Sequence, residues 1–297
     1  MNILITGANG QLGQEIRHLI AENDSPLGDI SPELLSANIL ATDVTGDDVV
    51  PLDITNSTEV ESLIRDNAIN VVINCAAATN VDGCETDPDF AQLLNEKGPK
   101  NLAKSCSNNG AVLCHVSTDY VFSGDNPMPQ TEDAICDPNT VYGKTKLAGE
   151  NAVRELCPQH FIVRTAWLYG KYGKNFVYTV LNLGKEKDSI KVVDDQHGSP
   201  TNAADLAYEI LSLIGTENYG TYHCTGNGAT TWNVFAQEIM NRAGLSCDVQ
   251  GCSSAEWAAP APRPAWSILD NKHLRDTIGD KMPSWDVSLN RFLDSIR

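Results

Sequence analysis

Two short motifs carry side chains suited to proton transfer. Ser117 and Thr118 follow an apolar run, and Tyr142 precedes Lys146 by four residues. A spacing of four on a helix places both side chains on one face, where the ammonium group can hold the phenol ready for proton transfer. A hydroxyl from Ser117 or Thr118 can face this pair. These residue types together predict a site that reduces a carbonyl group.

A parallel sheet wound with helices is the architecture that the chain predicts around these motifs. Short apolar runs rich in β-branched residues alternate with helical patterns, which is typical of this fold. Strands are predicted at 2–6, 38–42, 70–75, 111–116 and 160–165, with helices at 11–22, 56–67, 88–108, 142–156, 201–214, 232–243, 271–278 and 286–296. Irregular connections are expected at 23–37 and at 123–141, the second of which lies at an edge of the predicted site.

A glycine turn follows the first predicted strand. Gly7, Gly10 and Gly13 surround Gln11 and Leu12 at the start of the helix at 11–22. Such glycines allow a tight turn and a close approach of a diphosphate to the backbone, and the helix N-terminus supplies unpaired N–H groups. Because the turn lies between a strand and an amphipathic helix, it predicts a dinucleotide-binding site rather than a structural turn.

Further cofactor contacts are expected along the carboxyl ends of the strands. An acidic residue at the end of the second strand would hydrogen-bond the adenosine ribose, and Asp43 lies close to that position. The chain has no Lys or Arg between Arg17 and Arg65, which favours NADH, although NADPH stays open. The predicted cofactor contacts are Gly7, Gly10, Gln11, Leu12, Gly13, Asp43, Asp53, Ile54, Ala77, Ala78, Thr79, Tyr142 and Lys146.

Charge and cysteine content narrow the class of protein. The 297 residues include 21 Lys and Arg against 39 Asp and Glu, a formal net charge of -18, which argues against nucleic acid or an anionic membrane as partner. We expect a cytoplasmic protein, because no signal segment and no run of about eighteen apolar residues occurs. The 9 cysteines include no Cys-x-x-Cys pair, so free thiols are expected.

Motifs spread over nearly the whole chain resemble one family. The glycine turn with Tyr142 and Lys146 resembles the extended short-chain dehydrogenase/reductase superfamily, and within it the chain resembles the dTDP-4-dehydrorhamnose reductases. The narrower match rests on 77–82, 117–122, 141–150, 164–169, 195–201 and 263–264. The segment 23–37 is longer than expected for that family. The resemblance implies reduction of the 4-keto group of dTDP-4-dehydro-β-L-rhamnose by NADH or NADPH, giving dTDP-L-rhamnose.

The resemblance also assigns roles to individual residues. Tyr142 is expected to donate the proton and Lys146 to lower the pKa of its phenol and hold the nicotinamide ribose, while Thr118, in preference to Ser117, hydrogen-bonds the substrate oxygen. The predicted substrate contacts are Thr118, Asp119, Tyr120, Trp167, Asn175 and Arg263. For Trp167 a place in the core, and for Asn175 and Arg263 an ordinary surface position, stay open.

No catalytic metal is predicted. His197 follows Asp194 and Asp195, but Asp and Gly are common in turns for backbone reasons alone. A Mg²⁺ ion bridging two subunits of a homodimer, with Glu15, is implied only by the resemblance.

A Rossmann-type doubly wound parallel sheet with a smaller lobe is therefore the expected fold. The dinucleotide-binding domain is predicted from 1–168 and 200–214, and the substrate-binding lobe from 169–199 and 215–297. Two alternatives remain: another nucleotide-sugar 4-ketoreductase or epimerase on the same scaffold, and a non-catalytic regulatory subunit that keeps the fold.

Overall fold

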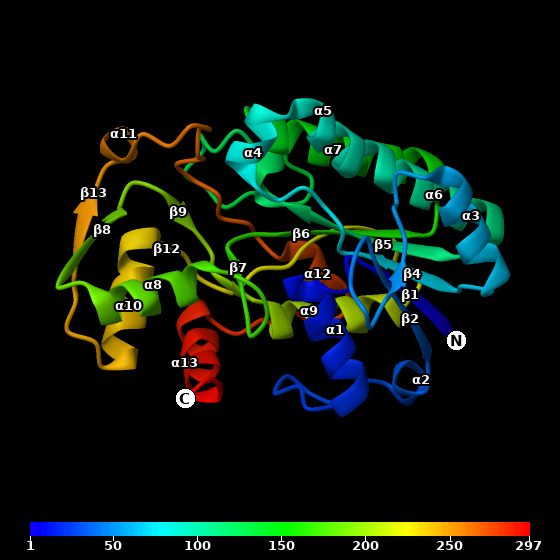
Figure 1. The fold of residues 1–297 in the computed structure, drawn as a ribbon, viewed down its shortest axis with the longest axis horizontal. Coiled ribbons are helices and arrows are strands. Elements are labelled where there is room, and N and C mark those ends of the chain that lie inside the picture. The colour runs from blue at the N-terminus through cyan, green and yellow to red at the C-terminus, as the bar shows by residue number, and fades with distance from the viewer.

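A seven-stranded parallel sheet forms the centre of the molecule in the computed structural model, which describes residues 1–297 (Figure 1). The strands follow the order β11-β6-β5-β4-β1-β2-β3, and every neighbouring pair is parallel. They are β1 (Asn2–Thr6), β2 (Asn38–Asp43), β3 (Val50–Pro51), β4 (Val71–Asn74), β5 (Val112–Thr118), β6 (His160–Thr165) and β11 (Gly220–His223). The strand order reverses between β1 and β4, where such sheets form a ligand-binding crevice at the carboxyl ends.

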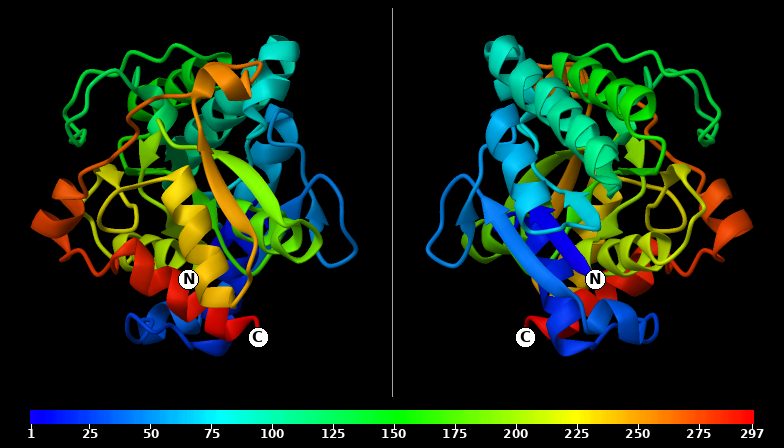
Figure 2. Two further views of the ribbon diagram at one scale, coloured as in Figure 1. Left: turned by 90° about the vertical axis from the view of Figure 1, so that its left-hand side faces the viewer. Right: turned by 90° about the vertical axis from the view of Figure 1, so that its right-hand side faces the viewer.

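Helices cover both faces of this sheet (Figures 1 and 2). On one face lie α1 (Gln11–Glu22) and α9 (Ala203–Ile214), and on the other lie α3 (Ser57–Asp66), α6 (Gly98–Asn109) and α7 (Val141–Leu156). Successive side chains of β1 point to opposite faces of the sheet and pack against opposite helix layers. Ile3 and Ile5 pack towards α1, whereas Leu4 packs towards α3 and α6.

A separate hydrophobic cluster holds the smaller lobe together. It joins α8 (Phe176–Glu186), α10 (Trp232–Ala243) and α13 (Trp285–Ser295) to the parallel pair of β8 (Ser189–Val193) and β13 (Asp248–Cys252). Two short pairs connect the parts: β7 (Leu168–Tyr169) with β10 (Thr201–Asn202), and β9 (His197–Gly198) with β12 (Thr230–Thr231). The remaining helices are α2 (Pro32–Leu35), α4 (Val81–Thr86), α5 (Pro88–Gln92), α11 (Ser254–Trp257) and α12 (Lys272–Thr277).

The predicted doubly wound parallel sheet is confirmed, and two of the assignments made from the sequence differ from the structure. The strand β11 pairs with β6 in the main sheet, although 215–297 was assigned to the smaller lobe. The helix predicted over 88–108 is divided by a π-helical turn, Leu93–Lys97. Pro99 explains the division, because its ring nitrogen cannot donate to a carbonyl one turn earlier.

Two expectations about the chain as a whole can also be compared with the structure. All nine cysteines are free thiols, as predicted. None of the helices has the length and apolar character that a membrane span requires.

The long connection at 23–37 contains the short helix α2, whose Leu34 is buried beside Ile30 in the core.

Candidate active site

The carboxyl end of β5 supplies the first part of the site. The hydroxyl of Thr118 donates to Asp119 Oδ1 at 2.9 Å and accepts from the backbone N–H of Tyr120 at 3.2 Å. These bonds start a single 3₁₀ turn, Asp119–Val121, directly after the strand. Thr118 and Asp119 are both buried, and Asp119 Oδ2 has no hydrogen-bond partner.

The first turns of α7 supply the second part. Thr140 caps the helix by accepting from the N–H of Gly143 at 2.9 Å, which fixes where Tyr142 and Lys146 point. Lys146 Nζ donates to the carbonyl oxygen of Val116 in β5 at 2.7 Å. The phenol of Tyr142 is within hydrogen-bonding reach of Thr118. The structure therefore brings together the three residues predicted to be catalytic.

Burial shifts the pKa values of Tyr142 and Lys146. It raises the pKa of the Tyr142 phenol, and the hydrogen bond with Thr118 opposes this only in part. Burial lowers the pKa of Lys146 to about 8, against the nearby carboxylate of Glu150. The Lys146 ammonium donates to Val116 in this structure, and the expectation that it lowers the pKa of Tyr142 stays a prediction. The phenol keeps its proton at neutral pH, which is the form that a proton donor needs.

Asp119 adds a second buried carboxyl group to the site. Burial raises its pKa to about 6, and the hydrogen bond from Thr118 opposes the rise. Asp119 can therefore accept hydrogen bonds as a carboxylate above that pH. Its Oδ2 has no hydrogen-bond partner, although the Ser267 hydroxyl is near enough to lower the pKa of the carboxyl group.

The glycine turn has the geometry that dinucleotide binding requires. Gly7 has φ +64°, and a Cβ there would lie 2.7 Å from the backbone nitrogen of Ala76, so no other residue fits. Gly10 precedes α1 without a side-chain cap, which leaves N–H groups of the first turn for a diphosphate. Asp43 ends β2 and accepts from the N–H of Asn9 in the turn at 3.1 Å.

Arg17 is a cofactor candidate that the sequence did not identify. It extends from α1 to Asn9 Oδ1 at 3.3 Å and forms an ion pair with Asp48 at 2.8 Å. A cation therefore lies beside the same turn as Asp43, although no Lys or Arg follows in the sequence until Arg65. Arg17 lies inside α1, but side chains on a helix lean towards its N-terminus, so the Arg17 guanidinium reaches back to the glycine turn.

The remaining cofactor candidates are divided between the surface and the core. Asp53 is exposed, whereas Ile54 is buried in the layer of α3 and α6, and Asn101 donates to the carbonyl oxygen of Ile54 at 3.0 Å. Ala77, Ala78 and Thr79 follow β4. The Ile54 side chain is therefore used for packing, and a contact of Asp53 and Ile54 with the adenine stays a prediction.

Asn95 is a further residue that sequence reasoning missed. It is fully buried in the π-helical turn, accepts from the N–H of Ala78 at 2.8 Å and donates to Thr145 Oγ1 at 3.2 Å. It thus ties the predicted cofactor loop to the helix that carries Tyr142 and Lys146. Pro99, inside a predicted helix, was the available signal for an irregular turn at this point.

A cleft of about 560 Å³ lies beside the catalytic end of the sheet. Tyr120, Asp82 and Arg263 line one part of it, and Phe176 and Trp232 line another. The ring of Tyr120 lies edge-on to that of Tyr142, with centroids 5.4 Å apart, so the cleft lies next to the residues predicted to be catalytic. Arg263 Nη2 is 2.9 Å from Asp82 Oδ2.

Trp167 occupies a strained position behind this cleft. It is half-buried, has φ +49°, and stacks on Trp232 with ring centroids 3.5 Å apart and planes 8° apart. A non-glycine residue in this region costs about 1–3 kcal/mol and is found mainly at functional sites. Gly198 makes room for it, since a Cβ there would lie 2.4 Å from the indole.

Asn175 does not line the cleft with Arg263. Its amide nitrogen donates to Gln11 Oε1 at 3.1 Å and to the carbonyl oxygen of Gly170 at 2.9 Å. Its oxygen accepts from the N–H of Tyr178 and so caps α8. The structure places this candidate against the cofactor turn, where it joins the smaller lobe to α1.

The carboxylates considered for a metal have hydrogen-bond partners. Asp194 accepts from Thr231 at 2.6 Å, Asp195 accepts from Ser254, and Glu15 accepts from the N–H of Lys171 at 3.1 Å. His197 stacks on Trp266, with centroids 3.9 Å apart. The chain forms no group of three or more His, Cys, Asp or Glu side chains that could hold a metal ion.

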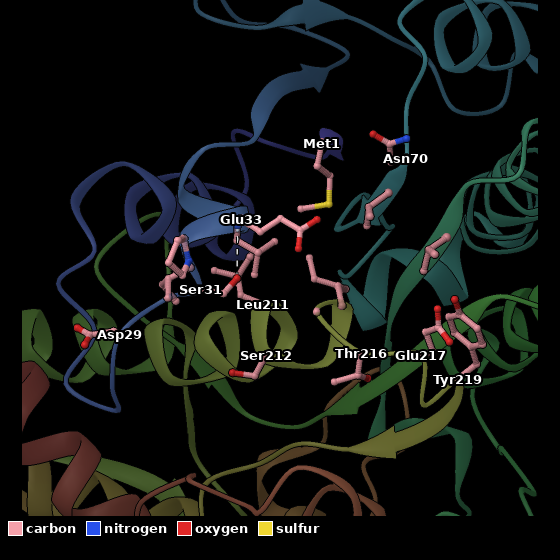
Figure 3. A pocket seen from close by; sticks show the side chains of 17 residues that line it. Met1, Asp29, Ser31, Glu33, Asn70, Leu211, Ser212, Thr216, Glu217 and Tyr219 are labelled. Carbon is pink, nitrogen blue, oxygen red and sulfur yellow. Dashed lines mark hydrogen bonds between the residues drawn. The ribbon is translucent and has the colours of Figure 1, made fainter.

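A second hollow, of about 700 Å³, lies at the opposite edge of the sheet (Figure 3). Met1, Asn70 and Val112 at the amino ends of strands line it, together with Glu33 and Glu217. None of the predicted site residues lies there. Because ligands of such sheets bind at the carboxyl ends of the strands, the catalytic site belongs to the other edge.

The fold and the Thr118, Tyr142 and Lys146 group define an NAD(P)-dependent oxidoreductase of the short-chain dehydrogenase/reductase class. The chain matches the family model described as RmlD substrate binding domain over residues 1–297, and it belongs to that family. It is similar to the dTDP-4-dehydrorhamnose reductase of Streptomyces griseus, with 40% identity over 293 residues that cover 96% of this chain and 91% of the relative.

Two solved structures are similar to this chain over its length. A dTDP-4-dehydrorhamnose reductase from Clostridium acetobutylicum is 46% identical with a TM-score of 0.92, and the match covers 100% of this chain and 99% of that one. The dTDP-4-dehydrorhamnose reductase from Bacillus anthracis, solved in complex with NADP, is 41% identical with a TM-score of 0.91 and 99% coverage of both chains.

Proposed function

We propose that this protein reduces the 4-keto group of dTDP-4-dehydro-β-L-rhamnose with NADPH or NADH, giving dTDP-L-rhamnose. The reductases to which the chain is similar support this reaction. The observation that carries the proposal is that Thr118, Tyr142 and Lys146 lie together at the carboxyl end of β5, next to a cleft lined by Arg263.

The protein supplies the proton and positions the carbonyl. A nicotinamide cofactor, when bound, supplies the hydride for the carbonyl carbon. Tyr142 gives its proton to the carbonyl oxygen as negative charge develops there, and Thr118 hydrogen-bonds the same oxygen. The Lys146 ammonium then stabilises the phenolate that remains on Tyr142. One hydride and one proton convert the ketone into an alcohol.

The remaining site residues have proposed roles in binding the two ligands. The glycine turn, with Asp43 and Asp53, holds the cofactor, and Ala77, Ala78 and Thr79 leave space for it. Asp119 Oδ2 accepts from a sugar hydroxyl, because it is buried without a partner. Tyr120 and Trp167 pack against the sugar and Arg263 binds the diphosphate, for which its planar guanidinium is suited. Asn175 positions Gln11 at the cofactor turn by donating a hydrogen bond to its side-chain oxygen.

We propose a division into two parts that follows the hydrophobic clusters. Residues 1–168 and 200–214, together with β11, form the dinucleotide-binding part, and 169–199 with most of 215–297 form the substrate-binding part. The nine free thiols support a reducing compartment, which agrees with the expected location in the cytoplasm.

Arg17 supports a role for NADPH as well as NADH. Its guanidinium lies beside the turn and Asp43, where a 2′-phosphate of the adenosine ribose would be placed in such folds. We expect Arg17→Ala to raise the KM for NADPH by about tenfold or more, the value of one charge-assisted hydrogen bond, and to leave the KM for NADH within about twofold. Steady-state kinetics with both cofactors measure this, and equal losses for both would contradict the assignment.

The reaction is tested by following the oxidation of NADPH and NADH with dTDP-4-dehydrorhamnose. Tyr142→Phe keeps the ring and removes the proton donor, so we expect turnover to fall by about 10²-fold or more with little change in melting temperature. Unchanged turnover would refute the role of the phenol. Turnover by protein with tightly bound NAD and no added cofactor would indicate an epimerase, and no oxidation of cofactor on any keto-sugar nucleotide would indicate a non-catalytic protein.

A further inference from the structure

One segment lines part of the cleft and is attached both to the smaller lobe and to the dinucleotide-binding part. It runs from Ser253 to Arg263, includes α11, and is called the clasp below (Figure 1). At its start, Ser254 donates its backbone N–H to Asp195 Oδ2 at 2.8 Å and its hydroxyl to Oδ1 at 2.6 Å. At its end, the N–H of Ala261 donates to Asp82 Oδ1 at 3.0 Å.

Both ends of the clasp are therefore fixed by carboxylates on different parts of the molecule. Asp195 belongs to the smaller lobe, and Asp82 belongs to α4 beside the catalytic end of the sheet. The backbone between them turns at Ala258, which has φ +49° and ends α11. The residues between the two fixed ends, Trp257 to Pro260, line the cleft.

Trp257 differs from every other tryptophan in the chain. Trp167, Trp232, Trp266 and Trp285 are half-buried and each packs against another aromatic ring. Trp257 is 59% exposed and lies in no such pair. An exposed large aromatic side chain at a cleft is an unused stacking surface, which is typical of a ligand-binding position.

The order of groups along the cleft indicates which part of a ligand reaches Trp257. Tyr120 contacts Tyr142 and so marks the reacting end, and Arg263 is close enough to Tyr120 to act on its pKa. At the other end, Glu256, next to Trp257, is close to Lys191. A nucleotide sugar has the order sugar, diphosphate, nucleoside. With the sugar at Tyr142 and the diphosphate at Arg263, the base extends to Trp257 at the end of α11.

We propose that Trp257 stacks on the nucleobase of the substrate and that the clasp holds it there. This inference rests on the proposed function, since it assumes a nucleotide sugar in the cleft. The two carboxylate attachments fix the backbone of the clasp before the ligand arrives, which lowers the entropy cost of placing the indole. Stacking accepts any base, so Trp257 contributes affinity for the nucleotide rather than the choice of base.

A comparison of two ligands tests this contribution. Binding of dTDP is measured by isothermal titration calorimetry, and binding of inorganic pyrophosphate, which has no base, is measured by competition with dTDP. For Trp257→Ala we expect about 5- to 150-fold weaker binding of dTDP, the range found for base stacking on aromatic side chains, with pyrophosphate unchanged. Trp257→Phe, which keeps a ring, should bind dTDP within a few-fold of the wild type.

Phe90→Ala provides the matched control. Phe90 is an aromatic residue of α5 that is 54% exposed and lies outside the cleft, so its loss should change neither ligand's affinity. Equal losses for dTDP and pyrophosphate would mean general damage to the clasp and would overturn the proposal.

The two proposals can fail separately. If the wild type oxidises no NADPH with dTDP-4-dehydrorhamnose, the proposed function fails whatever the variant does. If the wild type is active and Trp257→Ala binds dTDP as tightly as the wild type, only the role of Trp257 fails.

Discussion

Burial acts in opposite directions on the pKa values of Tyr142 and Lys146, two ionisable groups of α7. It raises the pKa of Tyr142, which disfavours the phenolate, and lowers the pKa of Lys146 to about 8, which disfavours the ammonium. The phenol is therefore protonated at neutral pH, whereas the Lys146 ammonium loses its proton as the pH rises through about 8. Lys146 is the group whose titration should be visible in the kinetics.

We expect kcat/KM to fall as the pH rises through about 8. Lys146 has its pKa lowered from the ordinary 10.5, so the ammonium is present below about 8 and lost above it. Without it, the phenolate left on Tyr142 lacks its stabilising charge. A pH profile of kcat/KM, which reports the ionisations of the free enzyme, measures this. Lys146→Met should be nearly inactive, and a wild-type profile that stays flat to pH 10 would contradict the assignment.

At the scale of single elements, the parts of the site that depend on neighbouring residues could be predicted from the sequence. The turn after β1 requires Gly7 because of its positive φ, and a strand before it and an amphipathic helix after it gave the context. Tyr142 and Lys146 share a face because four residues make about one turn of helix. Local backbone geometry decides both features, so composition and spacing were sufficient to predict them.

Other elements depend on contacts between distant parts of the chain and could not be predicted in this way. β11 is short and partly polar, and it becomes a strand only because it pairs with β6. Arg17 reaches the cofactor turn from inside α1, and Asn95 meets Ala78 only where the helix forms a π-helical turn. The contact of Trp167 with Gly198 could not be predicted either, because it joins the residue before β7 to the strand β9.

At the scale of the whole molecule, one buried ion cluster joins several layers. Glu150 of α7 accepts from Arg164 Nε at 2.9 Å and from Arg164 Nη2 at 2.8 Å, and Arg154 Nη2 lies 2.6 Å away. Arg164 lies on β6 and also contacts His223 of β11 at 3.3 Å. Burial raises the pKa of Glu150, but the hydrogen bonds and charge of Arg164 outweigh it and leave the pKa below its usual value. The cluster therefore ties the catalytic helix to the edge of the sheet.

Removing one member of this cluster should destabilise the whole fold. Arg164→Met leaves the fully buried Glu150 with only the partly exposed Arg154, and breaking such a pair costs about 3–5 kcal/mol. Urea denaturation measures the free energy of unfolding. The exposed pair of Arg65 and Asp66 is the control, since Arg65→Met should cost about 1 kcal/mol or less.

The double variant Glu150→Leu/Arg164→Met separates the two contributions to that cost. If the loss comes from a buried charge without its partner, removing both charges should restore part of the stability, because no carboxylate is then left in the interior. If the loss comes from the packing of the Arg164 side chain, the double variant should be at least as unstable as the single one. Recovery would show that the loss in Arg164→Met comes from the unpaired Glu150 carboxylate, so that the helix carrying Tyr142 and Lys146 depends on charge pairing with a residue of the neighbouring strand.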